Sequence, residues 1–157
     1  MSTLKVPGAQ LSYEVSGSGP LLILIPGSAG VGEVFRPLAH HLSAQYQVVT
    51  YDRRGFSRSS LDEPQNYDHR LSTDADDVRR LIEHLTDNAA SVFGNSSGAL
   101  VALEVISHSP ELVQTVVAHE PPAVSLLPDA AKWWAFFDGI YDIYRKDGVP
   151  KAMHLLR

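Results

Sequence analysis

The feature that most constrains this chain is the five-residue stretch Gly94-Asn95-Ser96-Ser97-Gly98. An apolar run, Ala89 to Phe93, precedes it, and a helical pattern from Ala99 to Ser107 follows it. A G-x-S-x-G turn between a strand and a helix is so tight that its central serine takes strained backbone angles and projects its hydroxyl above the sheet. A side chain on either glycine would collide with the adjacent strand or helix. The pattern predicts Ser96 as a nucleophile, and a purely structural Gly-Ser turn is the alternative.

A second glycine-containing loop lies upstream. The continuous apolar run Leu21–Ile25 is typical of a strand that is buried on both faces. The loop Pro26–Gly30 follows it directly, and a helical pattern begins near Glu33. Backbone N–H groups of such a loop can converge on an anion, and in a serine hydrolase the residue after the nucleophile gives the second donor. The predicted oxyanion donors are the amides of Ser28 and Ser97.

Taken in order, these motifs resemble the α/β-hydrolase family from Leu11 to Pro122. The resemblance also includes the turn Gly17-Ser18-Gly19-Pro20, and the segment Asp52–Ser59, which looks like the family's D-x-R-G-x-G-x-S pattern. His119-Glu120-Pro121-Pro122 follows a further strand. Two departures are minor: Pro26-Gly27 stands for the family's usual His-Gly, and Ser57 replaces the second glycine of the segment.

The resemblance implies an α/β fold, a three-layer sandwich with a mostly parallel sheet that lacks the family's last strands. Residues 1–122 would form the N-terminal part of the hydrolase core, and residues 123–157 the start of a helical cap. The implied activity is hydrolysis of an ester-like bond in a small apolar substrate, with Ser96 as nucleophile.

The glycines also allow a second interpretation, a dinucleotide-binding βαβ unit in which Asp52 follows the second strand. The order of Gly27, Gly30 and Gly32 is G-x-x-G-x-G, which is not the order of that fingerprint, and the turn around Ser96 is left unexplained. We therefore expect no cofactor.

Bulk properties narrow the function further. The chain has 157 residues, a formal charge of −5 and a pI of about 5.7, which does not favour nucleic acid or an anionic membrane as a partner. It has no cysteine, no apolar leader at its N-terminus and no run long enough to span a membrane. Its seven histidines do not cluster at metal spacing, so no metal is expected. A cytoplasmic protein that acts on a small molecule is the default expectation.

The hydrophobic pattern predicts alternating strands and helices. A polar segment, residues 53–71, reads as a long loop, and Ser72 with Asp74, Asp76 and Asp77 reads as the cap and acidic first turn of the following helix. Asp52 and Arg54 are predicted to be structural, satisfied by local backbone and by each other. Strands are expected at 3–6, 11–16, 21–25, 46–51, 89–93 and 113–118, and helices at 34–43, 72–85, 99–108 and 128–145.

The last of these helices carries many aromatic residues. Trp133, Phe137 and Tyr141 lie on one face of it. It can be read as a core-facing helix, or as a cap helix that lines an apolar substrate pocket. The family resemblance favours these three residues as pocket residues.

A serine nucleophile needs a base and an acid that orients the base. In the family the usual order is Ser, then Asp or Glu, then His, and the segment that carries the usual acid and histidine follows strands that are absent from this sequence. Within the chain, Glu120 is a candidate acid, and His119 and His154 are candidate bases. We therefore expect weak or no activity, and the alternative is a truncated, non-catalytic protein that binds an apolar ligand or a partner chain. A homodimer through the exposed edge of Val113–Ala118 would be one such association.

Overall fold

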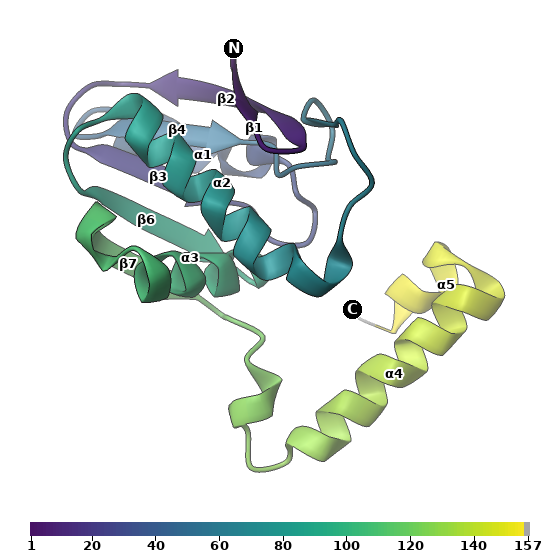
Figure 1. The fold of residues 1–157 in the computed structure, drawn as a ribbon. Coiled ribbons are helices and arrows are strands. Elements are labelled where there is room, and N and C mark those ends of the chain that lie inside the picture. Colours follow the sequence, from purple (N-terminus) through teal and green to yellow (C-terminus); the bar gives the residue numbers. More distant parts are fainter. Residues whose placement is uncertain (156–157) are drawn as a thin grey trace. The chain divides into compact units, whose positions relative to one another are not determined.

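In the computed structural model, residues 1–155 are described, and the chain divides into two units, Met1–Pro122 and Ala123–Arg157. The first unit is a three-layer α/β sandwich (Figure 1). The second unit is helical, and the last two residues of the predicted cap lie outside the described part. Each unit is considered by itself below.

The sheet of the first unit is mostly parallel. Its strand order is β1-β2-β4-β3-β6-β7, and the short strand β5 pairs with β2 outside this path. β4, β3, β6 and β7 run parallel, while β2 is antiparallel to β1, β4 and β5. β6, the strand before the Ser96 turn, lies between β3 and β7, as predicted. The strands are β1 (Ser2–Val6), β2 (Ala9–Ser16), β3 (Leu21–Ile25), β4 (Gln47–Tyr51), β5 (Ser60–Leu61), β6 (Ala90–Asn95) and β7 (Val113–His119).

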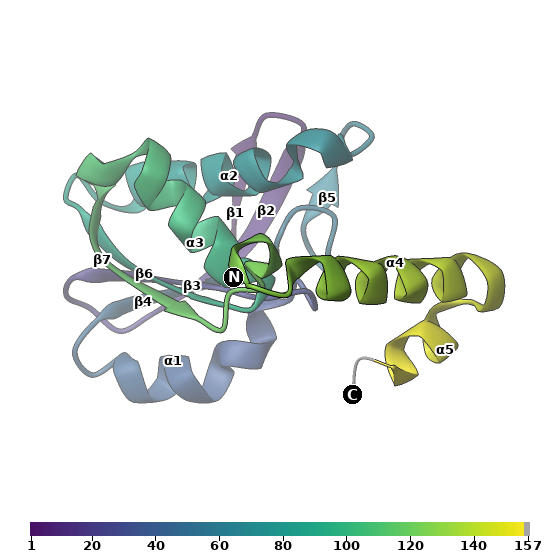
Figure 2. The ribbon, with the colours of Figure 1, turned by 90° about the horizontal axis from the view of Figure 1, so that it is seen from below.

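Helices cover both faces of this sheet (Figure 2). α1 (Arg36–Leu42) packs on one face, where Leu22, Leu24 and Phe35 form a small core. α2 (Arg70–Leu85) and α3 (Ser97–His108) pack on the other face over the main core. Every residue of β3 is buried, because helices cover the side chains on both of its faces. The predicted fold class is confirmed.

The predicted start of α2 is wrong. The helix begins at Arg70, and its first turn holds no acidic residue. The hydroxyls of Ser72 and Thr73 donate to the carbonyl of His69 at 3.0 and 2.7 Å. Asp74 and Asp77 lie further along, buried on the same face as the apolar side chains that contact the sheet. Their charges therefore lie in the interior of the protein and do not stabilise the N-terminus of the helix.

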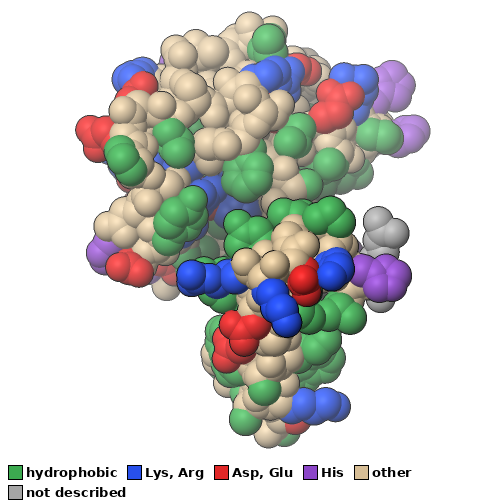
Figure 3. Space-filling model, turned by 90° about the vertical axis from the view of Figure 1, so that its right-hand side faces the viewer, with side chains coloured by type: hydrophobic (Ala, Val, Ile, Leu, Met, Phe, Trp, Pro, Cys, Tyr) green, Lys and Arg blue, Asp and Glu red, His purple; other side chains and the backbone are tan. Residues whose placement is uncertain are grey.

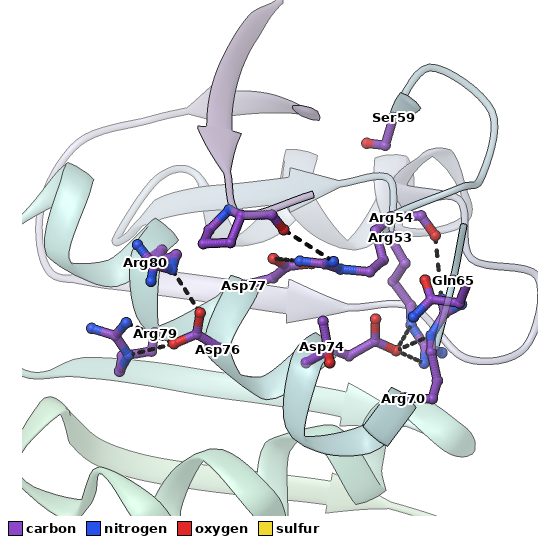
Figure 4. Close-up of polar contacts among 12 residues, drawn as sticks. Arg53, Arg54, Ser59, Gln65, Arg70, Asp74, Asp76, Asp77, Arg79 and Arg80 are labelled. Carbon is purple, nitrogen blue, oxygen red and sulfur yellow. Dashed lines mark hydrogen bonds and ion pairs between the residues drawn. The ribbon is translucent and has the colours of Figure 1, made fainter. Parts of the chain in front are cut away.

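Asp52 and Arg54 are buried, but the predicted pairing between them is wrong. Asp52 Oδ1 accepts from the amide of Gly32 at 2.9 Å, and its Oδ2 accepts from Arg58 Nε at 2.8 Å. Arg54 instead pairs with Asp77, to which its Nε donates at 2.7 Å (Figure 4). Burial alone would raise the pKa of Asp52, but the hydrogen bonds from Arg58 and Gly32 outweigh it and hold that pKa below its ordinary value.

The helical unit contains two helices where the sequence predicted one. α4 spans Ala130–Asp147 and α5 spans Val149–His154. Gly148 separates them with φ = 86°, a left-handed conformation that ends α4, and Pro150 lies in the first turn of α5. No helix in the described part of the chain is long and apolar enough to cross a membrane.

β7 is the last strand in the sheet order, and among residues 1–155 no strand pairs with its outer edge. Val117 in this strand is half-exposed. Association through this edge stays a prediction.

We predict that Asp52→Asn lowers the free energy of unfolding by about 3 kcal/mol near pH 7, because the charged hydrogen bonds to Arg58 and Gly32 are lost. The pKa of Asp52 is lowered in the folded state, so its contribution is present above the ordinary pKa and is lost as pH falls through the lowered one. The difference from wild type should therefore be largest above the ordinary aspartate pKa of about 3.9 and shrink as the pH falls below it, as measured by urea denaturation.

Asp87→Asn is the control, because Asp87 is exposed and should change stability by less than about 0.5 kcal/mol. A difference at Asp52 that does not vary with pH would show that its charge is not what stabilises the fold.

Candidate active site

The turn between β6 and α3 holds Ser96 in strained backbone geometry. Ser96 has φ = 52° and ψ = −125°, a conformation that L-residues rarely adopt, and it is exposed. β6 ends at Asn95 and α3 begins at Ser97, so Ser96 alone reverses the chain between strand and helix. The strain predicted for this serine is confirmed.

The two glycines of the turn are required by close backbone contacts. A Cβ on Gly94 would lie 2.2 Å from the carbonyl oxygen of Gly98. A Cβ on Gly98 would lie 2.4 Å from the carbonyl oxygen of Ile25, at the end of β3. These distances are far inside van der Waals contact, so any side chain would force the first turn of α3 away from the sheet. The collision predicted from the sequence is confirmed.

The loop after β3 lies directly against Ser96. The amide of Gly27 donates to Asn95 Oδ1 at 3.0 Å, and a Cβ on Gly27 would lie 3.1 Å from Ser96 Cβ. Ser28 is exposed in this loop. Within residues 1–155, the amides of Ser28 and Ser97 donate to no other group. Both donors are thus available, and their role in an oxyanion hole stays a prediction.

The end of β7 lies beside the Ser96 turn. The amide of Ser96 donates to the carbonyl of His119 at 2.9 Å. Glu120 follows immediately and has φ = 51°, a second strained residue next to the first. It is exposed, and no hydrogen bond or ion pair of its carboxylate occurs in the described residues. A role for Glu120 as the acid stays a prediction.

His119 is exposed, and its imidazole makes a stacking contact with another strand. Its ring stacks on Phe93, with centroids 6.3 Å apart, and Phe93 contacts Phe35 on the face that α1 covers. Among residues 1–155 no histidine is hydrogen-bonded to Ser96. The first unit contains five other histidines. His40 and His41 belong to α1, His69 lies just before α2, His84 belongs to α2, and His108 is at the end of α3.

In the helical unit, apolar side chains line a cleft of about 360 Å³ between α4 and α5. Phe137 and Tyr141 belong to this cleft, whereas Trp133 contacts Phe136 instead. Hydrophobic side chains of this unit lie at the surface (Figure 3), and Tyr141 is 56 % exposed. A substrate-binding role for Trp133, Phe137 and Tyr141 stays a prediction. His154 belongs to the same unit, at the end of α5.

A buried set of charged residues behind the site was not predicted from the sequence. Arg53 pairs with Asp74 of α2, and Arg54 pairs with Asp77 one turn further on (Figure 4). Arg70 also donates to Asp74, at 2.9 Å. The available signal was the spacing: two adjacent arginines, followed by two aspartates three residues apart on the apolar face of a helix.

Burial has its clearest effect on one carboxyl group of this cluster. It raises the pKa of Asp77 above its ordinary value, even though Arg54 opposes this. Burial, together with nearby Asp74, raises the pKa of Tyr51 as well. Tyr51 is therefore a neutral phenol at physiological pH. No group of three acidic or histidine side chains in the described part of the chain is arranged to hold a metal ion.

The model of the alpha/beta hydrolase fold family matches residues 20–156. The chain belongs to this family. It is 46% identical over 125 residues to a protein of Bacillus subtilis named uncharacterized hydrolase YraK, with 80% of this chain and 46% of that protein covered. It is 35% identical over 120 residues to the zearalenone hydrolase of Cladophialophora bantiana, with 75% and 45% covered.

Solved structures of the family are similar as well. E-2-(acetamidomethylene)succinate hydrolase is 31% identical, with a TM-score of 0.67 over 74% of this chain and 42% of that one. An epoxide hydrolase of Bacillus megaterium matches 98% of this chain and 58% of its own, with a TM-score of 0.78 at 22% identity, which speaks for the fold alone. The chain spans about half the length of the curated relatives it matches.

We predict that Ser96→Gly stabilises the protein. The strain of a non-glycine residue in this conformation costs about 1–3 kcal/mol, and glycine removes it at an entropic cost of about 0.5–1 kcal/mol. The net gain should be about 1 kcal/mol in urea denaturation.

Ser91→Gly in the same strand is the matched control, because Ser91 has no positive φ and should lose about 1 kcal/mol. Equal losses for both variants would mean that Ser96 is not strained.

Proposed function

We propose that this chain is the nucleophile-bearing part of a serine hydrolase that acts on an ester-like bond of a small, mostly apolar substrate. The observation that carries the proposal is the strained, exposed Ser96 at the strand-to-helix turn, with the Gly27 loop packed against it. A fold that keeps about 1–3 kcal/mol of strain at one exposed hydroxyl is best explained by a function of that hydroxyl.

In the proposed reaction, Ser96 Oγ attacks the substrate carbonyl, and the carbonyl oxygen gains negative charge. The amides of Ser28 and Ser97 donate to that oxygen. Each such donor contributes about 10²–10³ in rate, because it is fixed in place before the charge develops. The start of α3 adds its positive end to the same site.

Glu120 is the proposed acid that orients the base. It follows the carbonyl that binds the amide of Ser96, so its backbone is fixed relative to the nucleophile. Its positive φ and its exposed carboxylate support this role over a purely structural one. The carboxylate would bind one nitrogen of an imidazole while the other nitrogen accepts the proton of Ser96.

The base is proposed to reach Ser96 from outside the sheet core. It takes the proton of Ser96 Oγ and later returns it to the leaving group. His119 is the weaker candidate, because its ring stacks on Phe93. His154, a longer form of the chain, or a partner chain could supply the imidazole. A homodimer joined at the outer edge of β7 would be one such arrangement.

The alternative function is non-catalytic binding of an apolar ligand. One observation favours it: no histidine in residues 1–155 is hydrogen-bonded to Ser96. The apolar cleft between α4 and α5, with Phe137 and Tyr141, would then contribute to ligand binding. Trp133 would take part only if the ligand extends along α4.

Two relatives are named for hydrolysis of zearalenone and of E-2-(acetamidomethylene)succinate. For this chain we propose small esters and related acyl compounds as the substrate class. Zearalenone and short p-nitrophenyl esters form a suitable first panel.

We predict that a fluorophosphonate probe labels the purified chain at Ser96. Ser96→Ala should abolish the labelling, while Ser125→Ala, which changes an exposed serine of the helical unit, should leave it unchanged. Intact-mass and peptide mass spectrometry measure the extent and the site. A chain that is not labelled at Ser96 but binds the apolar esters would support the binding alternative.

In a form of the protein that includes the base, Glu120→Gln should slow ester hydrolysis by at least about tenfold, because an amide does not stabilise the imidazolium that forms during attack. Initial rates with a p-nitrophenyl ester measure this. Glu111→Gln, at another exposed position near β7, is the control. Equal rates for Glu120→Gln and wild type would remove Glu120 from the mechanism.

A further inference from the structure

Arg53 contacts two parts of the candidate site from the interior of the protein. It is buried, with 7% of its surface exposed, and follows the end of β4. Its Nη1 donates to Ser97 Oγ at 2.9 Å and to the carbonyl of Gly27 at 3.1 Å, with the carbonyl of Pro26 at 3.4 Å. One side chain thus joins the β3 loop to the first residue of α3.

The other side of the guanidinium is held by α2. Nε donates to Asp74 Oδ2 at 3.2 Å, and Nη2 binds the same oxygen. Asp74 is in turn held by Arg70, whose Nη2 also donates to the carbonyl of Arg54 at 3.3 Å. The planar fork of Arg53 is therefore fixed before any substrate binds, in a way that the flexible ammonium of a lysine could not reproduce.

The contact with Gly27 bears on the amide of Ser28. The carbonyl of Gly27 and the N–H of Ser28 belong to one planar peptide unit, and none of the described peptide bonds is cis. In a trans peptide these two groups point in opposite directions. Because Arg53 binds the carbonyl, the N–H of Ser28 is turned away from Arg53 and α2. The amide of Gly30 also donates to this carbonyl, at 3.0 Å, and reinforces the orientation.

We propose that Arg53 is a positioning residue that orients the Ser28 amide as an oxyanion donor, by holding the Gly27 carbonyl, and that fixes the Ser97 side chain beside it. This rests on the proposed function of Ser96. Its neighbour Arg54 has no such role, since its guanidinium binds Asp77 and the carbonyl of Pro7. The two pairs are alike in burial and chemistry but differ in their contact with the site.

The experiment compares Arg53→Gln/Asp74→Asn with Arg54→Gln/Asp77→Asn. Each double variant removes both charges of its pair. Arg70, which also pairs with Asp74, loses that partner in the Arg53 variant, but its side chain is partly exposed and can be solvated. The first readout is amide hydrogen exchange by NMR at Gly27 and Gly30, with Val92 in the buried centre of β6 as reference. Exchange at Gly27 and Gly30 should become at least about tenfold faster relative to Val92 in the Arg53 variant only.

The second readout is the rate constant for phosphonylation of Ser96 by a fluorophosphonate probe. It should fall by about 100-fold in the Arg53 variant, since one donor is misplaced. It should stay within about threefold in the Arg54 variant. Arg53→Lys, which keeps the charge beside Asp74 but lacks the fork, should also lose most of the rate.

The two readouts separate the failure of this proposal from the failure of the proposed function. Exchange at Gly27 and Gly30 that is unchanged in the Arg53 variant overturns the positioning role, whatever the probe does. Faster exchange with an unaltered phosphonylation rate overturns it too, because the orientation of Ser28 is then unused. A wild-type chain that the probe does not label shows that Ser96 is not activated in this chain alone, and the exchange at Gly27 and Gly30 then decides the positioning role by itself.

Discussion

The candidate site depends on how closely the first turn of α3 approaches the end of β3. A Cβ on Gly98 would lie 2.4 Å from the carbonyl oxygen of Ile25 and 2.7 Å from that of Pro26. This contact between two backbones sets the height of the turn above the sheet. The chain must therefore change direction at Ser96, which adopts φ = 52°. The strain at Ser96 is thus a consequence of close packing two residues away, and the exposed hydroxyl follows from the strain.

Such a contact between backbones does not determine the orientation of the peptide groups in the Gly27 loop. A buried ion pair determines it. Arg53 and Asp74 lie in the interior, and a buried ion pair is stable only when its remaining donors find partners. Two of the remaining partners are the Gly27 carbonyl and the Ser97 hydroxyl. The requirement to satisfy a buried guanidinium therefore orients the peptide whose N–H faces away from it. Under the proposed function, the orientation that stabilises the buried arginine is also the one that an oxyanion donor at Ser28 needs.

The sequence could predict the parts of this arrangement that are local. A buried apolar strand, two glycine-containing turns and the order of the motifs were enough for the sheet order around β6, for the layers and for the strain at Ser96. The sequence could not show which charges pair, because Arg53 and Arg54 reach aspartates 21 and 23 residues away. From the sequence alone, Asp74 and Asp77 look like acidic residues in the first turn of a helix. Only the structure shows that the helix begins earlier, at Arg70. The predicted helix ended at residue 145, close to the end of α4, and α5 was missed because no helix was predicted after Gly148.

The two residues at the end of β7, His119 and Glu120, differ in the positions of their side chains. The side chain of His119 lies on the α1 face of the sheet, where its ring stacks on Phe93. Glu120 follows the end of the strand and has a positive φ, so its side chain does not follow the alternation of strand residues between the two faces of the sheet. It lies at the open edge of the sheet, beside Ser96. Under the proposed function, the core thus supplies a nucleophile, two amides and a carboxylate, with the loop amide oriented through Arg53, and the imidazole comes from outside this core. Because Ser96, Ser28 and Glu120 are all exposed, a histidine carried by another segment could meet them without any rearrangement of the sheet. The fixed groups would determine where that ring binds, so the base could be contributed by a segment far less rigid than the core.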